Sequence, residues 1–269
     1  MSRAELARCR QVGVEAAQAA GQLLMRSLGK LRQSQVAQKG VSDYVTSLDR
    51  AAERIILRTI RARFPRHAIR AEESGRSRHT SPYEWVIDPL DGTTNYIHQF
   101  PAFAVSIALL TEGRLAVGVI YDPWRDELFH GMRGDGARLN RQVIHVAGRR
   151  RLAECLIATG FPFRIRTRLD RYLISFRKIF LHSSGIRRAG SAALDLAYTA
   201  CGRVDGFWEM GLSPWDIAAG ALLIEEAGGR VSDFAGQPGY LAHGSILAAN
   251  PMIHSQLVKF LKPVFPSGR

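Results

Sequence analysis

The string Trp-Val-Ile-Asp-Pro-Leu-Asp-Gly-Thr-Thr-Asn at positions 85–95 joins an apolar run to a polar turn. The apolar residues before Asp88 predict a short buried strand, and Gly92 directly after Asp91 predicts a tight turn. Asp-Pro and Asp-Gly are common turn dipeptides, so either aspartate alone would usually be a plain turn residue. The whole string is more specific, because it places two carboxylates and two hydroxyls where a buried strand ends. It therefore predicts a built site at this strand end.

Four more carboxylates lie where folding alone gives little reason for them. Glu72 and Glu73 follow an apolar residue, Asp49 opens one predicted helix, and Asp216 lies in the first turn of another. Each has an ordinary explanation, because the helix dipole favours an acid in a first turn and a Glu-Glu pair is usually on the surface. Together, carboxylates at strand ends and helix starts predict a shared cleft.

These carboxylates form a ligand set made of oxygen alone, with no nearby Cys and no clustered His. Such a set selects a hard cation, Mg²⁺ or Mn²⁺, over Zn²⁺. The backbone amides of Gly92 and Thr93, at a turn that leads toward a helix, would bind an anion. A metal beside an anion site indicates phosphoryl chemistry.

Two other templates fit the string less well. The haloacid dehalogenase phosphatases carry Asp-x-Asp-Gly-Thr with a nucleophilic first Asp, whereas Pro89 and Leu90 separate Asp88 from Asp91 here. The calcium loop of an EF-hand needs further acids and a closing Glu, which are missing. A water nucleophile activated by metal is the better prediction.

The composition sets outer limits on the class of protein. The 269 residues are 46% hydrophobic and 23% charged, which is typical of a folded chain and excludes intrinsic disorder. Apolar stretches such as residues 103–110 are far shorter than the roughly 18 residues that span a bilayer. The first turns are charged, so we expect no secretory signal and no membrane contact. Cys9, Cys155 and Cys201 are odd in number and scattered, which favours a reduced, cytoplasmic protein.

The net charge of +13 is the one compositional anomaly. Residues 138–188 hold thirteen Lys and Arg against two acids, and this basic segment would meet nucleic acid, an acidic protein or an anionic metabolite. The ordinary explanation is codon bias, because 32 of the 37 basic residues are Arg. Arg164, Arg166 and Arg168 alternate, so on an extended segment all three guanidinium groups would point to one side.

Hydrophobic periodicity and turn residues predict a mixture of helices and strands. The expected helices cover residues 4–28, 48–64, 190–201, 213–227 and 251–262. The expected strands cover residues 84–88, 103–110, 115–121, 155–159 and 205–209, and residues 38–43 read as a polar loop. Strict βαβ alternation is missing, which favours a layered α+β fold. We expect a single domain over residues 1–269, with a possible internal seam near residue 145.

Four separated motifs together resemble the inositol monophosphatase family, most of all its bacterial inositol-1-monophosphatase (extragenic suppressor) branch. They are the string 85–95, Glu72-Glu73-Ser74, Gly190-Ser191-Ala192-Ala193 and Trp215-Asp216-x-Ala218-Ala219-Gly220. Their order and spacing agree, and the resemblance runs over nearly the whole chain. It implies a layered αβαβα sandwich, a homodimer, dependence on two or three Mg²⁺ ions and sensitivity to lithium.

The resemblance also assigns expected roles to particular residues. The implied metal ligands are Glu72, Asp88, the carbonyl of Leu90, Asp91 and Asp216. Asp49 and Thr93 match the pair that positions and deprotonates the attacking water, with Glu73 and Lys39 in support. The implied substrate-binding residues are Leu90, Asp91, Gly92, Thr93, Arg187, Gly190, Ser191, Ala192, Glu209 and Asp216.

The resulting expectation is a Mg²⁺-dependent phosphatase that hydrolyses inositol 1-phosphate by metal-activated water. Two alternatives stay open. The chain would act as a partner in transcription antitermination or ribosome biogenesis, with RNA or an acidic transcription factor bound to the basic segment. Within the enzyme class, fructose 1,6-bisphosphate and 3′-phosphoadenosine 5′-phosphate are rival substrates.

Overall fold

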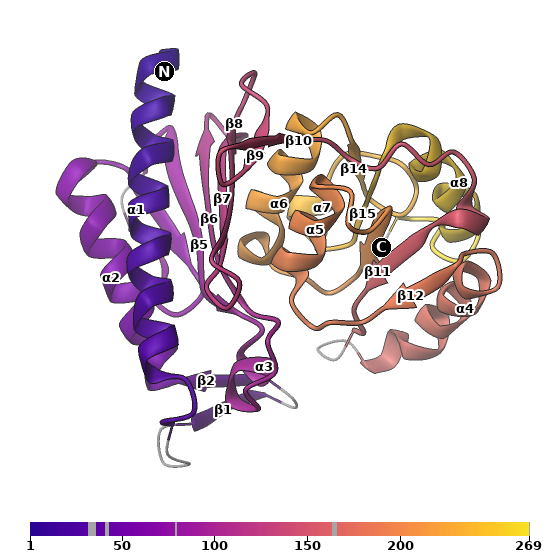
Figure 1. Ribbon diagram of the computed structural model, residues 1–269, viewed down its shortest axis with the longest axis horizontal. Coiled ribbons are helices and arrows are strands. Elements are labelled where there is room, and N and C mark those ends of the chain that lie inside the picture. Colours follow the sequence, from indigo (N-terminus) through magenta and orange to yellow (C-terminus); the bar gives the residue numbers. More distant parts are fainter. Residues whose placement is uncertain (32–35, 41–42, 79, 163–165, 269) are drawn as a thin grey trace.

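The computed structural model describes residues 1–31, 36–40, 43–78, 80–162 and 166–268. Two β-sheets alternate with three helical layers, so the fold is the expected αβαβα sandwich (Figure 1). A two-stranded hairpin lies below the larger sheet in the same view. It consists of β1 (Val36–Gly40) and β2 (Asp43–Thr46).

The larger sheet has eight strands in the order β10-β9-β8-β7-β6-β5-β3-β4 among the residues described. All neighbours in it are antiparallel except β3 and β5, which are parallel. Its strands are β3 (Ala68–Ala71), β4 (Gly75–Arg76), β5 (Tyr83–Asp91), β6 (Ala104–Thr111), β7 (Arg114–Asp122), β8 (Glu127–Met132), β9 (Ala137–Leu139) and β10 (Gln142–Ile144).

The smaller sheet has five strands in the order β12-β11-β13-β15-β14, again among the residues described. Strand β11 pairs in parallel with β12 and β13, whereas β15 is antiparallel to both of its neighbours. Its strands are β11 (Leu156–Thr159), β12 (Gly185–Arg187), β13 (Gly206–Glu209), β14 (Arg230–Ser232) and β15 (Ile246–Ala249).

The long helices fill the three helical layers. Helices α1 (Arg3–Ser27) and α2 (Ser47–Arg63) cover the outer face of the larger sheet, and α5 (Ala192–Ala200) and α6 (Pro214–Glu226) lie between the sheets. Helices α4 (Leu169–Phe180) and α8 (Pro251–Leu261) cover the smaller sheet. Shorter elements are α3 (Thr93–Ile97), α7 (Tyr240–His243) and the 3-10 helices η2 (Leu152–Glu154) and η3 (Arg166–Arg168).

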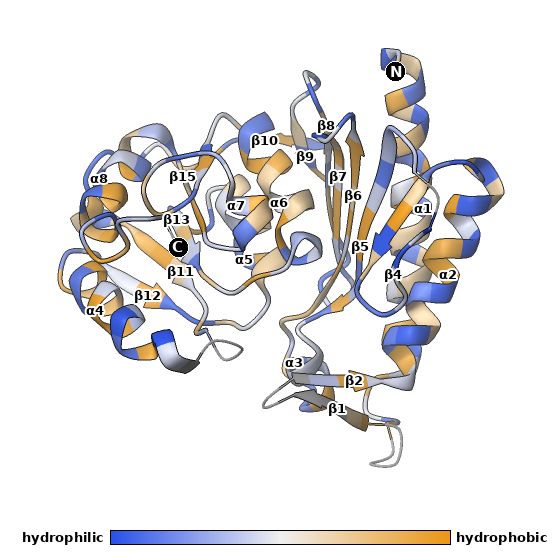
Figure 2. Cartoon of the chain, turned by 180° about the vertical axis from the view of Figure 1, so that it is seen from behind, coloured by the Kyte–Doolittle hydropathy of each residue, from blue (hydrophilic) through white to orange (hydrophobic). Residues whose placement is uncertain are grey.

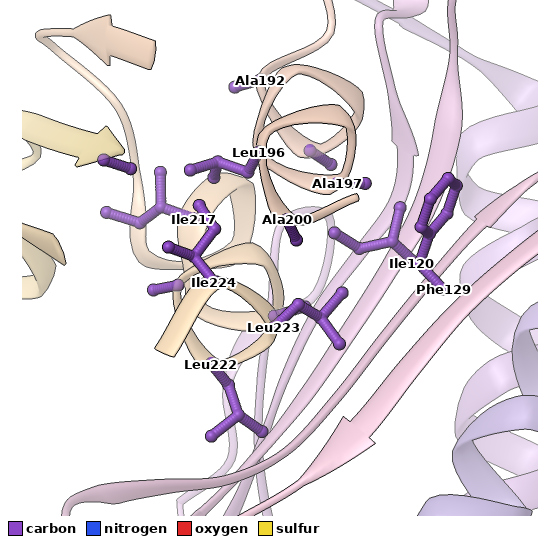
Figure 3. Packing of buried hydrophobic residues seen from close by; sticks show 14 of the residues in the cluster. Ile120, Phe129, Ala192, Leu196, Ala197, Ala200, Ile217, Leu222, Leu223 and Ile224 are labelled. Carbon is purple, nitrogen blue, oxygen red and sulfur yellow. The ribbon is translucent and has the colours of Figure 1, made fainter. Parts of the chain in front are cut away.

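The central helical layer is apolar on nearly every side because it lies between two sheets. In α6 every residue from 216 to 224 is buried, and α5 is buried almost as completely. Figure 3 shows Leu196 and Ile217 packed together, with Leu223 toward Ile120 of β7. Burying one such side chain contributes roughly 1.5–3 kcal/mol. Because this layer is fixed on both faces, the N-termini of α5 and α6 have defined positions.

Glycine allows the closest approach between these layers. A Cβ on Gly118 of β7 would lie 2.6 Å from the carbonyl oxygen of Ala219 in α6. Any larger residue at Gly118 would force the backbones of the sheet and the helix apart.

The predicted helices and strands lie where the sequence placed them, within a few residues at each end. The polar loop expected at 38–43 is wrong for residues 38–40 and 43, because these residues pair in the β1–β2 hairpin; residues 41–42 lie outside the described part. The condition of an extended segment at Arg164, Arg166 and Arg168 is not met in the described part, because Arg166 and Arg168 lie in η3. Arg164 lies outside the described residues. No described helix is both long and apolar enough to cross a bilayer.

Candidate active site

A cavity of about 310 Å³ opens where several strands end and several helices begin. The loop after β3 contributes Glu72, the end of β5 contributes Asp88 and Asp91, and the first turn of α6 contributes Asp216. The full lining is Tyr44, Glu72, Asp88, Leu90, Asp91, Gly92, Thr93, Thr94, Asn95, Arg188, Gly190, Ala192, Glu209, Leu212 and Asp216. The fold therefore brings Glu72, Asp88, Asp91 and Asp216 to one cavity, whereas the other two predicted carboxylates, Asp49 and Glu73, are not part of its lining.

Three of these carboxylates form a tight cluster. Asp88, Asp91 and Asp216 each place one oxygen so that all three atoms lie within 4.8 Å of one another. Burial, reinforced by the charges of Glu72, Asp91 and Asp216, raises the pKa of Asp88 well above its usual range. Like charges this close repel in a buried site, so the cluster fits a divalent cation, and its oxygen-only donors fit Mg²⁺. The cluster contains three of the five predicted metal ligands, and their role stays a prediction.

Helix N-termini hold two of the clustered carboxylates in place. Asp91 Oδ2 accepts hydrogen bonds from Ser191 Oγ at 2.5 Å and from the Ala193 amide at 2.7 Å, at the start of α5. Asp216 Oδ2 accepts the Ser213 amide at 2.7 Å within the capping box of α6. Both interactions satisfy orphan amides of a helix and fix the direction of a carboxylate.

The turn at Gly92 requires glycine. Gly92 has φ 91°, and a Cβ there would lie 2.8 Å from the carbonyl oxygen of Ala102. Asn95 holds the turn from the other side, because its Nδ2 donates to the carbonyls of Ala102 at 2.6 Å and Ala189 at 2.9 Å. The N-cap of α3 is Gly92, which makes no side-chain cap hydrogen bond, and Gly92 and Thr93 both line the cavity.

A hydrogen-bonded pair of Thr93 and Asp49 lies beside the carboxylate cluster. Thr93 Oγ1 lies 3.1 Å from Asp49 Oδ1 and 3.1 Å from the carbonyl oxygen of Leu90. Asp49 Oδ2 accepts the Thr46 amide at 2.8 Å and the Thr46 hydroxyl at 2.5 Å. Burial is the main reason that the pKa of Asp49 is raised, against these hydrogen bonds that lower it. Both neighbours of Thr93 Oγ1 are acceptors, so its single proton is used there and its lone pairs remain for a donor such as water.

The resemblance implies that Glu73 and Lys39 support the Thr93–Asp49 pair. The Glu73 amide donates to Glu53 Oε2 at 2.9 Å, and Glu73 Oε2 lies 3.9 Å from Arg50 Nε. The charge of Glu73 also contributes to the raised pKa of Asp49, so the two acids lie near each other. The side chain of Lys39 lies outside the described residues.

The cavity is also lined by Gly190 and Ala192 at the start of α5 and by Glu209 at the end of β13. Their predicted role in substrate binding stays a prediction. Ser191 is buried, does not line the cavity and instead bonds Asp91. Arg187 is exposed and is not in the lining, whereas its neighbour Arg188 is. The sequence alone gives no signal that shows which of these two adjacent arginines lines the cavity.

Sequence reasoning also missed a buried acid close to Glu209 and Asp91. Asp195 on α5 is only 3% exposed. Burial raises its pKa well above the usual range, and the charges of Glu209 and Asp91 add to this, whereas Arg188 opposes it. Its place in an apolar helix, between Leu194 and Leu196, was the available signal.

The site and the fold agree with the comparisons to known proteins. The model of the inositol monophosphatase family matches residues 5–263. The chain belongs to the inositol monophosphatase family. The Nus factor SuhB of Pseudomonas aeruginosa is 50% identical over 260 residues, which cover 95% of this chain and 96% of that protein. An inositol-1-monophosphatase of Mesorhizobium japonicum is 48% identical over 252 residues, which cover 93% and 95%.

Solved structures of family members have the same fold. The extragenic suppressor protein SuhB of Bartonella henselae has a TM-score of 0.91 at 46% identity and covers 94% of this chain and 97% of that one. The inositol monophosphatase of Anabaena has a TM-score of 0.88 at 47% identity and covers 97% and 98%. Family membership and the layered fold, both expected from the four motifs, are thus confirmed.

Proposed function

We propose that this member of the inositol monophosphatase family is a Mg²⁺-dependent phosphatase that hydrolyses inositol 1-phosphate to inositol and phosphate. One observation carries the proposal: Asp88, Asp91 and Asp216 cluster in one cavity whose lining includes Thr93, and the hydroxyl of Thr93 is hydrogen-bonded to the buried Asp49. The cluster suits cations, the pair suits a water molecule, and the turn between them suits a phosphate.

Glu72, Asp88, Asp91, Asp216 and the carbonyl of Leu90 would hold two or three Mg²⁺ ions. Bound Mg²⁺ supplies a Lewis acid that neutralises phosphate charge and lowers the pKa of a water ligand. The clamp of α5 on Asp91 and the capping box of α6 on Asp216 set the directions of two carboxylates before any ligand arrives. Preorganisation of this kind reduces the free-energy cost of binding.

Water activation falls to Thr93 and Asp49. The lone pairs of Thr93 Oγ1 accept a proton of the attacking water, while the hydroxyl proton is directed to Asp49 Oδ1 at 3.1 Å. A carboxylate with a raised pKa is a stronger base than an exposed one, which suits Asp49 to receive that proton. Glu73 and Lys39 would support this pair.

Phosphate and alcohol occupy neighbouring parts of the same cavity in this proposal. The uncapped amides at Gly92 and Thr93 bind phosphate oxygens. Glu209, Gly190 and Ala192 approach the inositol hydroxyls, and Asp216 orients the leaving oxygen. Ser191 acts through Asp91. For the cationic contact, the lining supports Arg188 in place of the predicted Arg187.

A phosphate-release assay over a panel of esters tests the proposal. Inositol 1-phosphate should be turned over with the highest kcat/KM, ahead of fructose 1,6-bisphosphate and 3′-phosphoadenosine 5′-phosphate. Release should require Mg²⁺, stop with a chelator and fall with lithium. A higher kcat/KM on either rival would reassign the substrate, and release that persists in a chelator would remove the metal from the proposal.

We also propose a homodimer, which the outer face of α4 supports. Leu173, Ile174, Phe180 and the following Leu181 are 43–59% exposed there, an unusual apolar density for a free surface. Sedimentation should give about twice the mass of the chain, and Ile174→Glu with Phe180→Glu should give the monomer mass. A monomeric wild-type protein would contradict this proposal.

A role as a partner protein in transcription is the second candidate function, because several similar proteins are named Nus factor SuhB. The predicted contact, the basic segment 138–188, is partly neutralised. Arg138 pairs with Asp135, Arg149 with Asp205, and Arg151 with Glu154. An Asp88→Asn variant that loses phosphate release but keeps a cellular role would separate the two functions.

A further inference from the structure

The outer face of α2 carries a row of arginines. Arg50, Arg54, Arg58, Arg61 and Arg63 are all exposed along this helix of 17 residues, which contains no lysine. Figure 2 shows hydrophilic residues alternating with apolar ones along α2, as expected for a helix with one buried face. We call Arg54, Arg58 and Arg61 the arginine row.

Acids of the same helix do not neutralise the arginine row. The two acids of α2 are both buried. Asp49 is bonded to Thr46 and Thr93, and Glu53 accepts the amide of Glu73 at 2.9 Å. Among the residues that the structure describes, no ion pair involves Arg54, Arg58 or Arg61. The row therefore differs from the basic segment, where several arginines have carboxylate partners.

The spacing of the arginine row directs its side chains to one place. Positions 54, 58 and 61 follow each other by four and three residues, so they lie on one face at a spacing of about 4.5–6 Å along the helix axis. Together with Leu57 and Ala62 they line a shallow recess on the surface. Three guanidinium forks around one recess suit ligands with several phosphate groups, because each fork binds an anionic oxygen pair in bidentate fashion.

The chemistry of this face favours one class of partner. A helix that lies on a membrane surface needs exposed apolar side chains to insert into the lipid. In α2, however, Ile56 and Ile60 are fully buried and Leu57 is only 8% exposed. The recess has no aromatic side chain on which a base would stack and no amide that would contact a base edge. What remains is contact with phosphates, which is independent of base sequence.

We propose that the arginine row binds the phosphate backbone of a nucleic acid without sequence preference. The row lies apart from the cavity, because it follows Arg50 along α2 away from the end that carries Asp49. It also lies on the flank of the molecule opposite to α4, which belongs to the basic segment (Figure 1). The proposal does not rest on the phosphatase activity, and strand binding leaves the cavity open.

The test compares two triple variants that remove the same charge. The first is Arg54→Gln, Arg58→Gln and Arg61→Gln. The matched control is Arg150→Gln, Arg171→Gln and Arg177→Gln, three exposed arginines of the basic segment. The probe is a fluorescent RNA of about 20 nucleotides with a 5′-hydroxyl, in chelator, so that no terminal phosphate or metal leads it to the cavity. Anisotropy is measured from low to physiological salt, with single-stranded DNA of the same sequence as a second probe.

We expect the first triple variant to bind RNA at least about tenfold more weakly than wild type, and the control within about threefold. The slope of log K against log salt should fall by about 2 in the first variant, because each strand phosphate contributes roughly 0.7. DNA of the same sequence should bind within a few-fold of RNA, and hydrolysis of the small ester should be unchanged.

Three outcomes would overturn the proposal. Equal losses in both variants would show a response to net charge alone. A loss only in the control would move the contact to the basic segment. Displacement of RNA by polyglutamate at equal charge concentration would favour an acidic protein as the partner.

Discussion

The cavity contains a cluster of acidic side chains, and the outer face of α2 carries a row of basic ones. The two groups differ in how far their charges are exposed to solvent. In the cavity, carboxylate oxygens of Asp88, Asp91 and Asp216 lie within 4.8 Å of each other in a buried site. On α2, Arg54, Arg58 and Arg61 lie about a helical turn apart in contact with solvent. Burial raises the pKa of Asp88, because a low dielectric strengthens repulsion and penalises the ionised form.

The difference shows how burial turns a cluster of charges into a demand for a ligand. Water and salt screen the arginine row, so its repulsion costs little folding free energy. In the carboxylate cluster Asp88 and Asp216 are buried, so its repulsion is screened less and lowers stability until a cation binds. Four predictions test this contrast, in order of decreasing effect.

Replacing Asp88 should have the largest effect. Asp88→Asn should lower Mg²⁺-dependent phosphate release by about a thousandfold or more, since losing roughly 4 kcal/mol of charge stabilisation has that effect on rate. Without metal, its Tm should be above that of wild type, because one repelling charge is gone. The assay is phosphate release together with thermal unfolding in chelator. The control is Asp170→Asn on the exposed surface of α4, which should match wild type; a folded Asp88→Asn variant with wild-type turnover would exclude the metal assignment.

Removing the hydroxyl of Thr93 should have the next largest effect. Thr93→Ala should lose roughly a hundred- to ten-thousandfold in kcat, the usual contribution of a general base, with a smaller change in KM. Thr93→Ser keeps the hydroxyl 3.1 Å from Asp49 and should recover most of the rate. Steady-state kinetics measures both variants. Isolation of a phosphorylated Asp88 during turnover would instead support a covalent mechanism.

Asp195 should show the cost of a buried charge as a dependence of stability on pH. Its pKa is raised in the folded state, mainly by burial, so its contribution to stability is full below the unfolded value of 3.8 and is lost as pH rises toward the folded pKa. Asp195→Asn has no such loss. In chelator, the Tm of the variant minus that of wild type should therefore increase from pH 5 to pH 8, by roughly 2–4 °C per kcal/mol. If the Tm difference between the variant and wild type stays constant or decreases from pH 5 to pH 8, the pKa of Asp195 is not raised in the folded state.

The arginine row should give the smallest effect on folding. Replacing Arg54, Arg58 and Arg61 with Gln should change the free energy of unfolding by less than about 0.5 kcal/mol per site, as is usual on the surface. Thermal unfolding at low and high salt measures this, with the triple variant of Arg150, Arg171 and Arg177 as control. A large loss of stability would mean that the row holds the fold together, contrary to its exposure.

Local signals determined much of this molecule from the sequence. The string 85–95 specified a strand, a glycine turn and the carboxylates at its end, because strand propensity and turn chemistry act over neighbouring residues. Ser213, Pro214 and Asp216 specified the start of α6 in the same way, through a capping box. Their match to a family pattern then predicted the layered fold.

Other local sequence patterns did not predict the backbone conformation correctly. The polar composition of residues 38–43 suggested a loop, yet backbone pairing made a hairpin of the described part. The alternation of Arg164, Arg166 and Arg168 would direct their side chains to one side only on an extended segment, whereas Arg166 and Arg168 lie in a 3-10 helix. Polar strands and short helices carry little hydrophobic periodicity, so their pattern does not specify backbone geometry.

Only the tertiary structure decided which distant residues meet. Asp216 lies within 4.8 Å of Asp88 because α6 is held between two sheets, and no local pattern spans 128 residues. The tertiary structure also turned Arg188 to the cavity in place of Arg187, and buried Asp195 behind Glu209. The sequence determined which chemical groups are present at the ends of its strands and helices. Packing determined their distances and burial, and with them the electrostatics of the site, because the energies of charges depend on neighbours far away in the chain.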